Sequence, residues 1–223
     1  PLGFAGYVSY RLQPQQQDLE LPDGLLAVDA TAGKALLVAA ECTADYRTLS
    51  EAWEAQELVS YCGVASGVTV LNALGEPATQ FSFFNDDTDA VRSRLQVTFG
   101  GMSLPDLAGL LRARGAETAM LHGDQVSVEE FRQLVAANLC REGDYLLVNY
   151  QREVLGQGRV GHISPLGAYD SATDRVLIMD TADYKYPFTW VPLTRLHAAM
   201  QEQDAATGRA RGLVEVRAAT PAG

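Results

Sequence analysis

The stretch that decides the interpretation of this chain is Gln56-Glu-Leu-Val-Ser-Tyr-Cys-Gly-Val-Ala-Ser-Gly-Val-Thr-Val-Leu-Asn-Ala-Leu-Gly75. After Cys62, apolar residues recur at the spacing of a helix, and Gly75 stands where a helix C-cap is expected. The pattern predicts a buried helix that begins at Cys62. A thiol in this position faces unpaired backbone N–H groups and the positive end of the helix dipole, and both favour the reactive thiolate.

Cys62 has two interpretations at this point. As a nucleophile, it has a partner in Gln56, whose side-chain amide can donate a hydrogen bond to a developing oxyanion. As a core residue, it is a small apolar side chain inside a helix, like most buried cysteines. This stretch alone favours the core interpretation, because a lone cysteine is a weak signal. The rest of the chain has to decide between the two.

Length and composition exclude several classes of protein. At 223 residues and 47% hydrophobic content, the chain can bury one domain or two closely joined halves. Its net charge of −11 argues against binding to nucleic acid or to an anionic membrane surface. No run of 18 apolar residues predicts a membrane span. The chain begins at Pro1 and not at Met, so the compartment, cytoplasm or bacterial periplasm, stays open.

The cysteines and two short motifs give no further site. Cys42, Cys62 and Cys140 are spaced like neither a disulfide scaffold nor a zinc site, and Cys42 and Cys140 are interpreted as structural. The acidic run 86–89 lacks the glycine and terminal glutamate of a calcium loop. The G-x-G-x-x-G pattern at 156–161 is followed by a predicted strand, whereas a dinucleotide site needs a helix there.

Periodicity predicts an α+β fold, with a helical N-terminal half packed on an antiparallel sheet. Segments 1–45 and 76–103 are interpreted as extended or loop-like. Ser103 caps a predicted helix 104–114, Ser127 forms a capping box with Glu130 at the start of another, and His122 is placed in the loop between them. Strands are predicted at 145–150, 161–169, 175–180 and 212–217, and a short helix at 192–201.

The hairpin around the turn 170–174 is the second informative feature. Folding the chain near 171–172 brings His162 opposite or diagonal to Asp180, and the parity of the spacing places both side chains on one face. A carboxylate beside an imidazole fixes its tautomer and stabilises the imidazolium. If the helical half packs Cys62 against that face, a Cys–His–Asp triad results, with His162 taking the thiol proton.

These residues resemble the phytochelatin synthase family. The resemblance rests on Tyr61-Cys-Gly-Val-Ala-Ser66 with Val70-Leu-Asn-Ala-Leu74, on Gly161-His-Ile-Ser-Pro-Leu166, and on Ile178-Met-Asp180 with Lys185-Tyr-Pro187 and Trp190-Val191. It covers roughly residues 20–217, and the motifs occur in the right order. The signature of ordinary papain-type peptidases, C-G-[SA]-C-[WY], is not in the sequence.

The resemblance implies a papain-like cysteine protease fold, a single catalytic domain over residues 1–223 and γ-glutamylcysteine acyl-enzyme chemistry. By position, Cys62 resembles the family's nucleophile, His162 its base and acid, Asp180 the orienting carboxylate and Gln56 the oxyanion donor. Asp204 and Arg211 match positions that hold the γ-glutamyl ammonium and carboxylate groups, and the charges suit that task. Arg152 and Lys185 match basic positions that are candidates for a second, anionic thiol substrate.

The implied reaction cleaves glycine from glutathione and passes the γ-Glu-Cys group either to water or to a second glutathione. No cofactor is expected, and a heavy metal such as cadmium or zinc is expected as a substrate thiolate, in keeping with metal detoxification. A homodimer stays open. Two departures favour hydrolysis: the chain does not contain the long Cys-rich C-terminal region of the plant and yeast enzymes, and Glu153 replaces an expected basic residue beside Arg152.

Two rival functions remain at this stage. One is another papain-like amidase or peptidase with a different γ-glutamyl or peptide substrate. The other is a non-catalytic module that binds glutathione or its metal thiolates. An intact triad argues against the second, whereas a Cys62 that is inert toward iodoacetamide at neutral pH would favour it.

Overall fold

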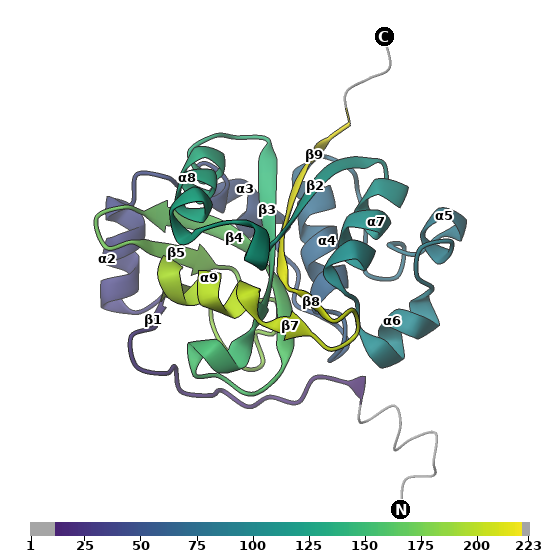
Figure 1. Ribbon diagram of the computed structural model, residues 1–223, viewed down its shortest axis with the longest axis horizontal. Helices are drawn as coiled ribbons and strands as arrows, with labels where there is room; N and C mark the ends of the chain where they lie inside the picture. Colours follow the sequence, from purple (N-terminus) through teal and green to yellow (C-terminus); the bar gives the residue numbers. More distant parts are fainter. Residues whose placement is uncertain (1–11, 220–223) are drawn as a thin grey trace, which may run out of the picture.

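A seven-stranded antiparallel sheet forms the centre of the computed structural model, which describes residues 12–219. Its strand order is β1-β6-β5-β4-β3-β9-β2, and every neighbouring pair is antiparallel. In Figure 1, α4 and α7 lie on one side of β3 and β9, and α8 and α9 lie on the other. The sheet is therefore covered on both faces, which explains why β3 and β4 are buried along nearly their whole length.

The elements have the following bounds. The strands are β1 (Leu26–Ala27), β2 (Ala116–His122), β3 (Asp144–Gln151), β4 (Gly161–Asp170), β5 (Arg175–Ile178), β6 (Thr189–Pro192) and β9 (Gly212–Ala218), with β7 (Gln203–Asp204) and β8 (Arg209–Ala210) forming a separate hairpin. The α-helices are α2 (Thr31–Ala39), α3 (Tyr46–Ala52), α4 (Cys62–Ala73), α5 (Asp86–Asp89), α6 (Arg94–Gly100), α7 (Leu104–Ala113), α8 (Val128–Leu139) and α9 (Leu193–Gln201). Two 3₁₀ turns are η1 (Gly123–Gln125) and η2 (Arg152–Leu155).

Helix α4 is the central helix of the first core. Residues 63–71 are all buried, and they pack with α3, α7 and one face of the sheet. Its glycines permit this close approach, since a Cβ at Gly67 would lie 2.9 Å from the Phe83 ring. Ser66 Oγ donates to the carbonyl of Ile163 at 3.1 Å, which ties the helix to strand β4. The helix that begins at Cys62 is thus fixed against the strand that carries His162.

The second core lies on the opposite face of the sheet. There α8 and α9 pack against side chains of the sheet, which alternate along each strand with the side chains that face the first core. Along β3, Leu147 belongs to the first core, whereas Leu146 and Val148 belong to the second. Among the described residues, no helix is long and apolar enough to cross a bilayer.

The α+β prediction is confirmed, with a helical N-terminal half and a mostly β C-terminal half. The predicted cap at Ser103, which forms a capping box with Asp106, and the predicted capping box of Ser127 with Glu130 are both present. The first eleven residues of the segment 1–45 lie outside the described part.

Several elements differ from the sequence prediction, among them the short helix α5 and the strands β6, β7 and β8, which it did not include. Residues 31–39 form helix α2, although neither end has a side-chain cap to signal it. Residues 94–100 form α6 and not a loop. His122 ends strand β2, an edge strand whose middle is exposed and whose alternation of apolar and polar residues is correspondingly weak.

Cys42 and Cys140 form a disulfide, although they lie 98 residues apart. The pair joins the loop before α3 to the end of α8. The expectation that both cysteines are structural agrees with this bond, but their spacing alone gave no indication of pairing. Of the three cysteines in the sequence, all within the described part, Cys62 is free.

Candidate active site

Cys62 is the first residue of α4 and is partly exposed. The first turn of a helix leaves its N–H groups without intrahelical partners, so the backbone of α4 presents donors beside the thiol. The Cys62 side chain lines a pocket of about 320 Å³ together with His162 and Ile163 of strand β4. The predicted position of the thiol, accessible at a helix N-terminus, is therefore confirmed.

His162 and Asp180 are adjacent, as the hairpin spacing predicts. His162 Nε2 lies 2.9 Å from Asp180 Oδ1, and both side chains are buried. His162 also acts on the Cys62 thiol, whose pKa it lowers. The structure thus brings Cys62, His162 and Asp180 together, with a hydrogen bond between the last two.

The electrostatics of these three groups favour a thiolate–imidazolium pair. Burial opposes ionisation of Cys62, but the hydrogen bond and charge of His162 outweigh it, so the pKa of the thiol is lowered. Burial and the charge of Arg152 oppose protonation of His162, but Asp180 outweighs both and raises its pKa. Burial would raise the pKa of Asp180, yet Arg152 and His162 hold it well below its usual range. Cys62 and His162 are therefore suited to act as nucleophile and acid–base partner.

Asp204 and Arg211 line the same pocket as Cys62. Arg211 Nη1 lies 3.7 Å from Asp204 Oδ2 and donates to Asn149 Oδ1 at 2.8 Å. The guanidinium lies against Gly161, where a Cβ would be 2.3 Å from Nη1. A side chain at position 161 would therefore displace Arg211. The structure brings this predicted pair next to the catalytic residues.

Two buried donors of the pocket wall have no hydrogen-bond partner in the described structure. They are Arg211 Nε and Asn149 Nδ2. Unpaired buried donors are costly, and at a functional site they are available to a ligand oxygen. Asn149 was not predicted as a site residue. The signal that could have found it is a polar residue inside the otherwise apolar strand 145–150.

Gln56 is buried and turned toward backbone carbonyls. Its Nε2 donates to Leu58 O at 2.9 Å and to Val59 O at 3.1 Å, and its Oε1 accepts from Thr181 at 3.5 Å. Gln56 is not one of the described residues that line the Cys62 pocket. Its role as oxyanion donor stays a prediction, and in this structure both of its N–H groups are already bonded.

Arg152 and Lys185 lie away from the pocket wall. The Arg152 side chain is 2% exposed, and its Nη2 lies 2.7 Å from Asp180 Oδ2. Lys185 is half-buried with Nζ 5.5 Å from the ring centre of Tyr184, and burial, aided by the charge of Arg152, lowers its pKa. Neither residue is among the described residues that line the Cys62 pocket. Binding of a second substrate by these two residues stays a prediction, which the burial of Arg152 does not favour.

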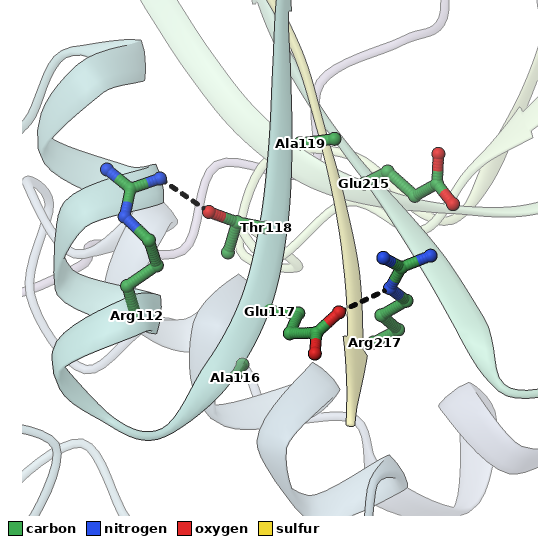
Figure 2. Close-up of a pocket in the computed structure, with 7 residues that line it drawn as sticks. All are labelled: Arg112, Ala116, Glu117, Thr118, Ala119, Glu215 and Arg217. Carbon is green, nitrogen blue, oxygen red and sulfur yellow. Dashed lines mark hydrogen bonds and ion pairs between the residues drawn. The ribbon is translucent and has the colours of Figure 1, made fainter. Parts of the chain in front are cut away.

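A second cavity, of about 450 Å³, lies at the outer edge of the sheet beside β2 and β9 (Figure 2). Three of its four charged groups bond within its own wall, where Arg112 donates to Thr118 at 2.7 Å and Arg217 to Glu117 at 2.9 Å. The residues that line it include no cysteine, serine or histidine. The candidate active site is therefore the pocket at Cys62.

Comparison with known proteins identifies the family of this chain. The family model described as phytochelatin synthase matches residues 16–213. The chain belongs to the phytochelatin synthase family. It is 36% identical over 166 residues to glutathione gamma-glutamylcysteinyltransferase 3 of Lotus japonicus, a match that covers 72% of this chain and 35% of the relative.

Two further relatives carry the same kind of name. Glutathione gamma-glutamylcysteinyltransferase 1 of Arabidopsis thaliana is 33% identical over 168 residues, or 73% of this chain and 35% of that protein. The glutathione gamma-glutamylcysteinyltransferase of Schizosaccharomyces pombe is 29% identical over 204 residues, or 87% of this chain and 49% of that protein. The chain thus spans between about a third and a half of the length of these relatives.

Among solved structures, the chain is similar to the Pseudomonas avirulence protein AvrPphB, at 12% sequence identity, with 76% of this chain and 97% of that chain covered. The TM-score of 0.31 is too low to support an argument about the fold. A helix bearing Cys62, packed on an antiparallel sheet that bears His162, is nonetheless the arrangement that the papain-like prediction requires. Within residues 12–219, no three histidine, cysteine, aspartate or glutamate side chains are grouped to hold a metal ion.

Proposed function

We propose that this chain cleaves the Cys–Gly amide of glutathione, forms a γ-Glu-Cys thioester on Cys62 and releases glycine. The observation that carries the proposal is the Arg211–Asp204 pair in the wall of the Cys62 pocket. The γ-glutamyl end of glutathione carries one ammonium and one carboxylate on the same carbon. A cation and an anion 3.7 Å apart match that zwitterion, and Arg211 Nε and Asn149 Nδ2 offer further donors to the carboxylate.

In the first step, the Cys62 thiolate attacks the carbonyl carbon of the cysteinyl residue, and His162 holds the thiol proton. The oxyanion that forms meets the backbone N–H groups at the start of α4, which supply electrostatic stabilisation. When the intermediate collapses, the C–N bond breaks and His162 passes its proton to the departing glycine nitrogen. The cysteinyl carbonyl is then bound to Cys62 as a thioester.

In the second step, His162 accepts a proton from the group that attacks the thioester carbonyl. With water, the products are γ-Glu-Cys and the free enzyme. With the α-amine of a second glutathione, the product is (γ-Glu-Cys)₂-Gly. We infer that hydrolysis dominates, because Glu153, exposed and 3.4 Å from Arg159, replaces the basic residue that the family resemblance implies at this position. Cadmium or zinc enters this scheme only as a thiolate of the substrate.

The test is mass spectrometry of the products after incubation with glutathione, with and without cadmium or zinc. Cys62→Ala, which removes the nucleophile, serves as the control and should yield neither product nor acyl adduct. Glycine with γ-Glu-Cys identifies a hydrolase, and (γ-Glu-Cys)₂-Gly identifies a synthase. Absence of both products and of any thioester on intact Cys62 would exclude glutathione as the substrate.

A further inference from the structure

Arg152 is a permanently charged residue enclosed by the protein. The residue is 1% exposed, and its side chain lies between two partners. Nη1 donates to Gln157 Oε1 at 2.7 Å, and Nη2 donates to Asp180 Oδ1 at 2.8 Å. The rings of Tyr150 and Tyr186 lie 5.9 and 5.3 Å from the guanidinium carbon. A buried charge persists only when it is paired and hydrogen-bonded, and here the paired anion is Asp180.

The Asp180 carboxylate contacts two basic side chains, Arg152 and His162. Its Oδ1 accepts from Arg152 Nη2, from His162 Nε2 at 2.9 Å and from the Ala182 N–H at 2.9 Å. Its Oδ2 lies 2.7 Å from the same Arg152 nitrogen. With one nitrogen near both oxygens, the carboxylate cannot turn without losing a contact. Its orientation toward His162 is therefore fixed by Arg152 and the Ala182 N–H.

We propose that Arg152 is a positioning residue of the catalytic centre, which holds the Asp180 carboxylate in line with His162 and neutralises part of its charge, and that it does not bind the second substrate. Both terminal nitrogens already have protein partners. The guanidinium is also outside the set of residues that line the Cys62 pocket. An incoming anion would have to displace Asp180 from it, which would disrupt the triad.

The consequence for catalysis is electrostatic as well as geometric. Arg152 lowers the pKa of His162, against Asp180 which raises it, and lowers the pKa of Cys62. The other charged or titratable groups around this centre include Tyr150, Tyr184, Tyr186, Asp183, Lys185 and the Asp204–Arg211 pair. Removing one positive charge from the cluster makes each loss of a proton harder. Both apparent pKa values of the Cys62–His162 pair should therefore rise.

The experiment measures alkylation of Cys62 by iodoacetamide across a pH range, by intact-protein mass. The reaction needs no substrate, so it is independent of the glutathione assignment, and the other two cysteines are joined in a disulfide. In Arg152→Gln, the alkylation profile should move to higher pH. Arg152→Lys keeps the charge but not the planar geometry, so its profile should stay near that of the wild type.

Glycine release, which rests on the proposed function, gives the second readout. We expect it to fall roughly 100-fold in Arg152→Gln, because the imidazole loses its fixed partner. If Arg152 acts through Asp180, Arg152→Gln should cost little in an Asp180→Asn background, whereas independent effects would add. Arg159→Gln is the matched control, since Arg159 lies seven residues on and its side chain is 83% exposed. It should leave both readouts unchanged.

A different set of results would overturn the proposal. If Arg152→Gln leaves the alkylation profile in place and lowers only transfer to a second glutathione, Arg152 binds the acceptor. Additive losses in the double variant with Asp180→Asn would also contradict a role through Asp180. If Arg152→Gln does not fold, Arg152→Lys decides: an unmoved alkylation profile with slower glycine release supports positioning, and unchanged glycine release overturns it. Failure of glycine release in the wild type itself would concern the substrate and not Arg152.

Discussion

The catalytic residues and the substrate-binding pair are held by very different parts of the molecule. Cys62 and His162 lie on α4 and β4, which belong to the main sheet and the buried helix packed on it. Asp204 lies on the two-residue strand β7, in a hairpin outside the main sheet, and Arg211 links the equally short strand β8 to β9 of the main sheet. Side chains of Asp204 and Arg211 are 14% and 10% exposed, against 3% for Asp180.

This difference indicates that one region carries out proton transfer and the other recognises the substrate. Groups that transfer protons need fixed distances, and a core with hydrogen bonds between helix and strand provides them. Groups that recognise the ends of a substrate need access to solvent for its entry and release. Variants of the two regions should therefore affect different kinetic constants.

The largest effect is expected for His162→Gln. Without the imidazole, neither the thiolate nor the proton donor for glycine is available, so kcat should fall by roughly 10³-fold or more. The KM for glutathione should change little, because the Asp204–Arg211 pair is untouched. Steady-state release of glycine measures both constants. A variant that keeps kcat and loses affinity would contradict the proposed division.

The second effect is expected for Arg211→Gln. Loss of charge-assisted hydrogen bonds to a substrate carboxylate removes about 1.5–3 kcal/mol of binding, so kcat/KM should fall roughly 10- to 100-fold, mainly through KM. Arg209→Gln is the matched control, because Arg209 is exposed in the same hairpin. The pH profile of Cys62 alkylation should stay in place. A loss in kcat with unchanged KM would place Arg211 in the chemical step.

How much of this site could be predicted depends on whether the residues that position each group are near to it or far from it in the sequence. The Cys62 helix and the His162–Asp180 hairpin follow from local periodicity and turn spacing, and the structure confirms both placements. The nearness of Asp204 and Arg211 to Cys62 came from the family resemblance, because a two-residue strand leaves no pattern in a sequence. The bond between Arg152 and Asp180 spans 28 residues, and the family resemblance had assigned Arg152 to a second substrate.

The parts of the fold prediction that were wrong have the same cause, because contacts between residues far apart in the sequence decide them. Strand β2 owes its conformation to pairing with β9, almost a hundred residues later, and its own exposed middle residues do not alternate clearly. Helix α2 packs Leu36 and Leu37 near Trp190, and Trp190 Nε1 donates to Gly33 O at 3.2 Å. Such tertiary contacts decide whether a segment forms a helix or an extended chain, and the sequence of the segment alone does not reveal them.

A buried carboxyl at the start of α3, a helix that contacts α4, tests whether the core that holds Cys62 is sensitive to pH. Asp45 precedes α3, is 1% exposed and has no partner for either carboxyl oxygen in the described structure. Burial, with the charge of Asp144 added, raises the pKa of Asp45 to about 8. The folded state therefore holds the proton more tightly than the unfolded state, and stability from this group declines as pH rises from above 4 through about 8.

Asp45→Asn cannot ionise, so its free energy of unfolding should fall less steeply over that pH range than that of the wild type. Above pH 8 we expect the variant to be more stable by about 1–3 kcal/mol, since it avoids a buried unpaired charge. Urea unfolding at several pH values measures the difference. Glu142→Gln, at an exposed neighbour, should change the slope far less. Equal slopes for wild type and Asp45→Asn would show that Asp45 is hydrated or paired.

The smallest effect is expected for Ser66→Ala, which removes the hydroxyl between α4 and β4. Ser66 Oγ lies 2.7 Å from Cys62 O and 3.1 Å from Ile163 O, so one proton serves two carbonyls beside the catalytic residues. Its loss should cost about 1 kcal/mol of stability. Because residues 63–71 remain packed, Cys62 should stay within reach of His162, and kcat should fall by less than about tenfold. Thermal unfolding and glycine release measure the two quantities. A fall in kcat as large as that of His162→Gln, with little change in stability, would mean that this one hydroxyl, and not the packed core, sets the distance between thiol and imidazole.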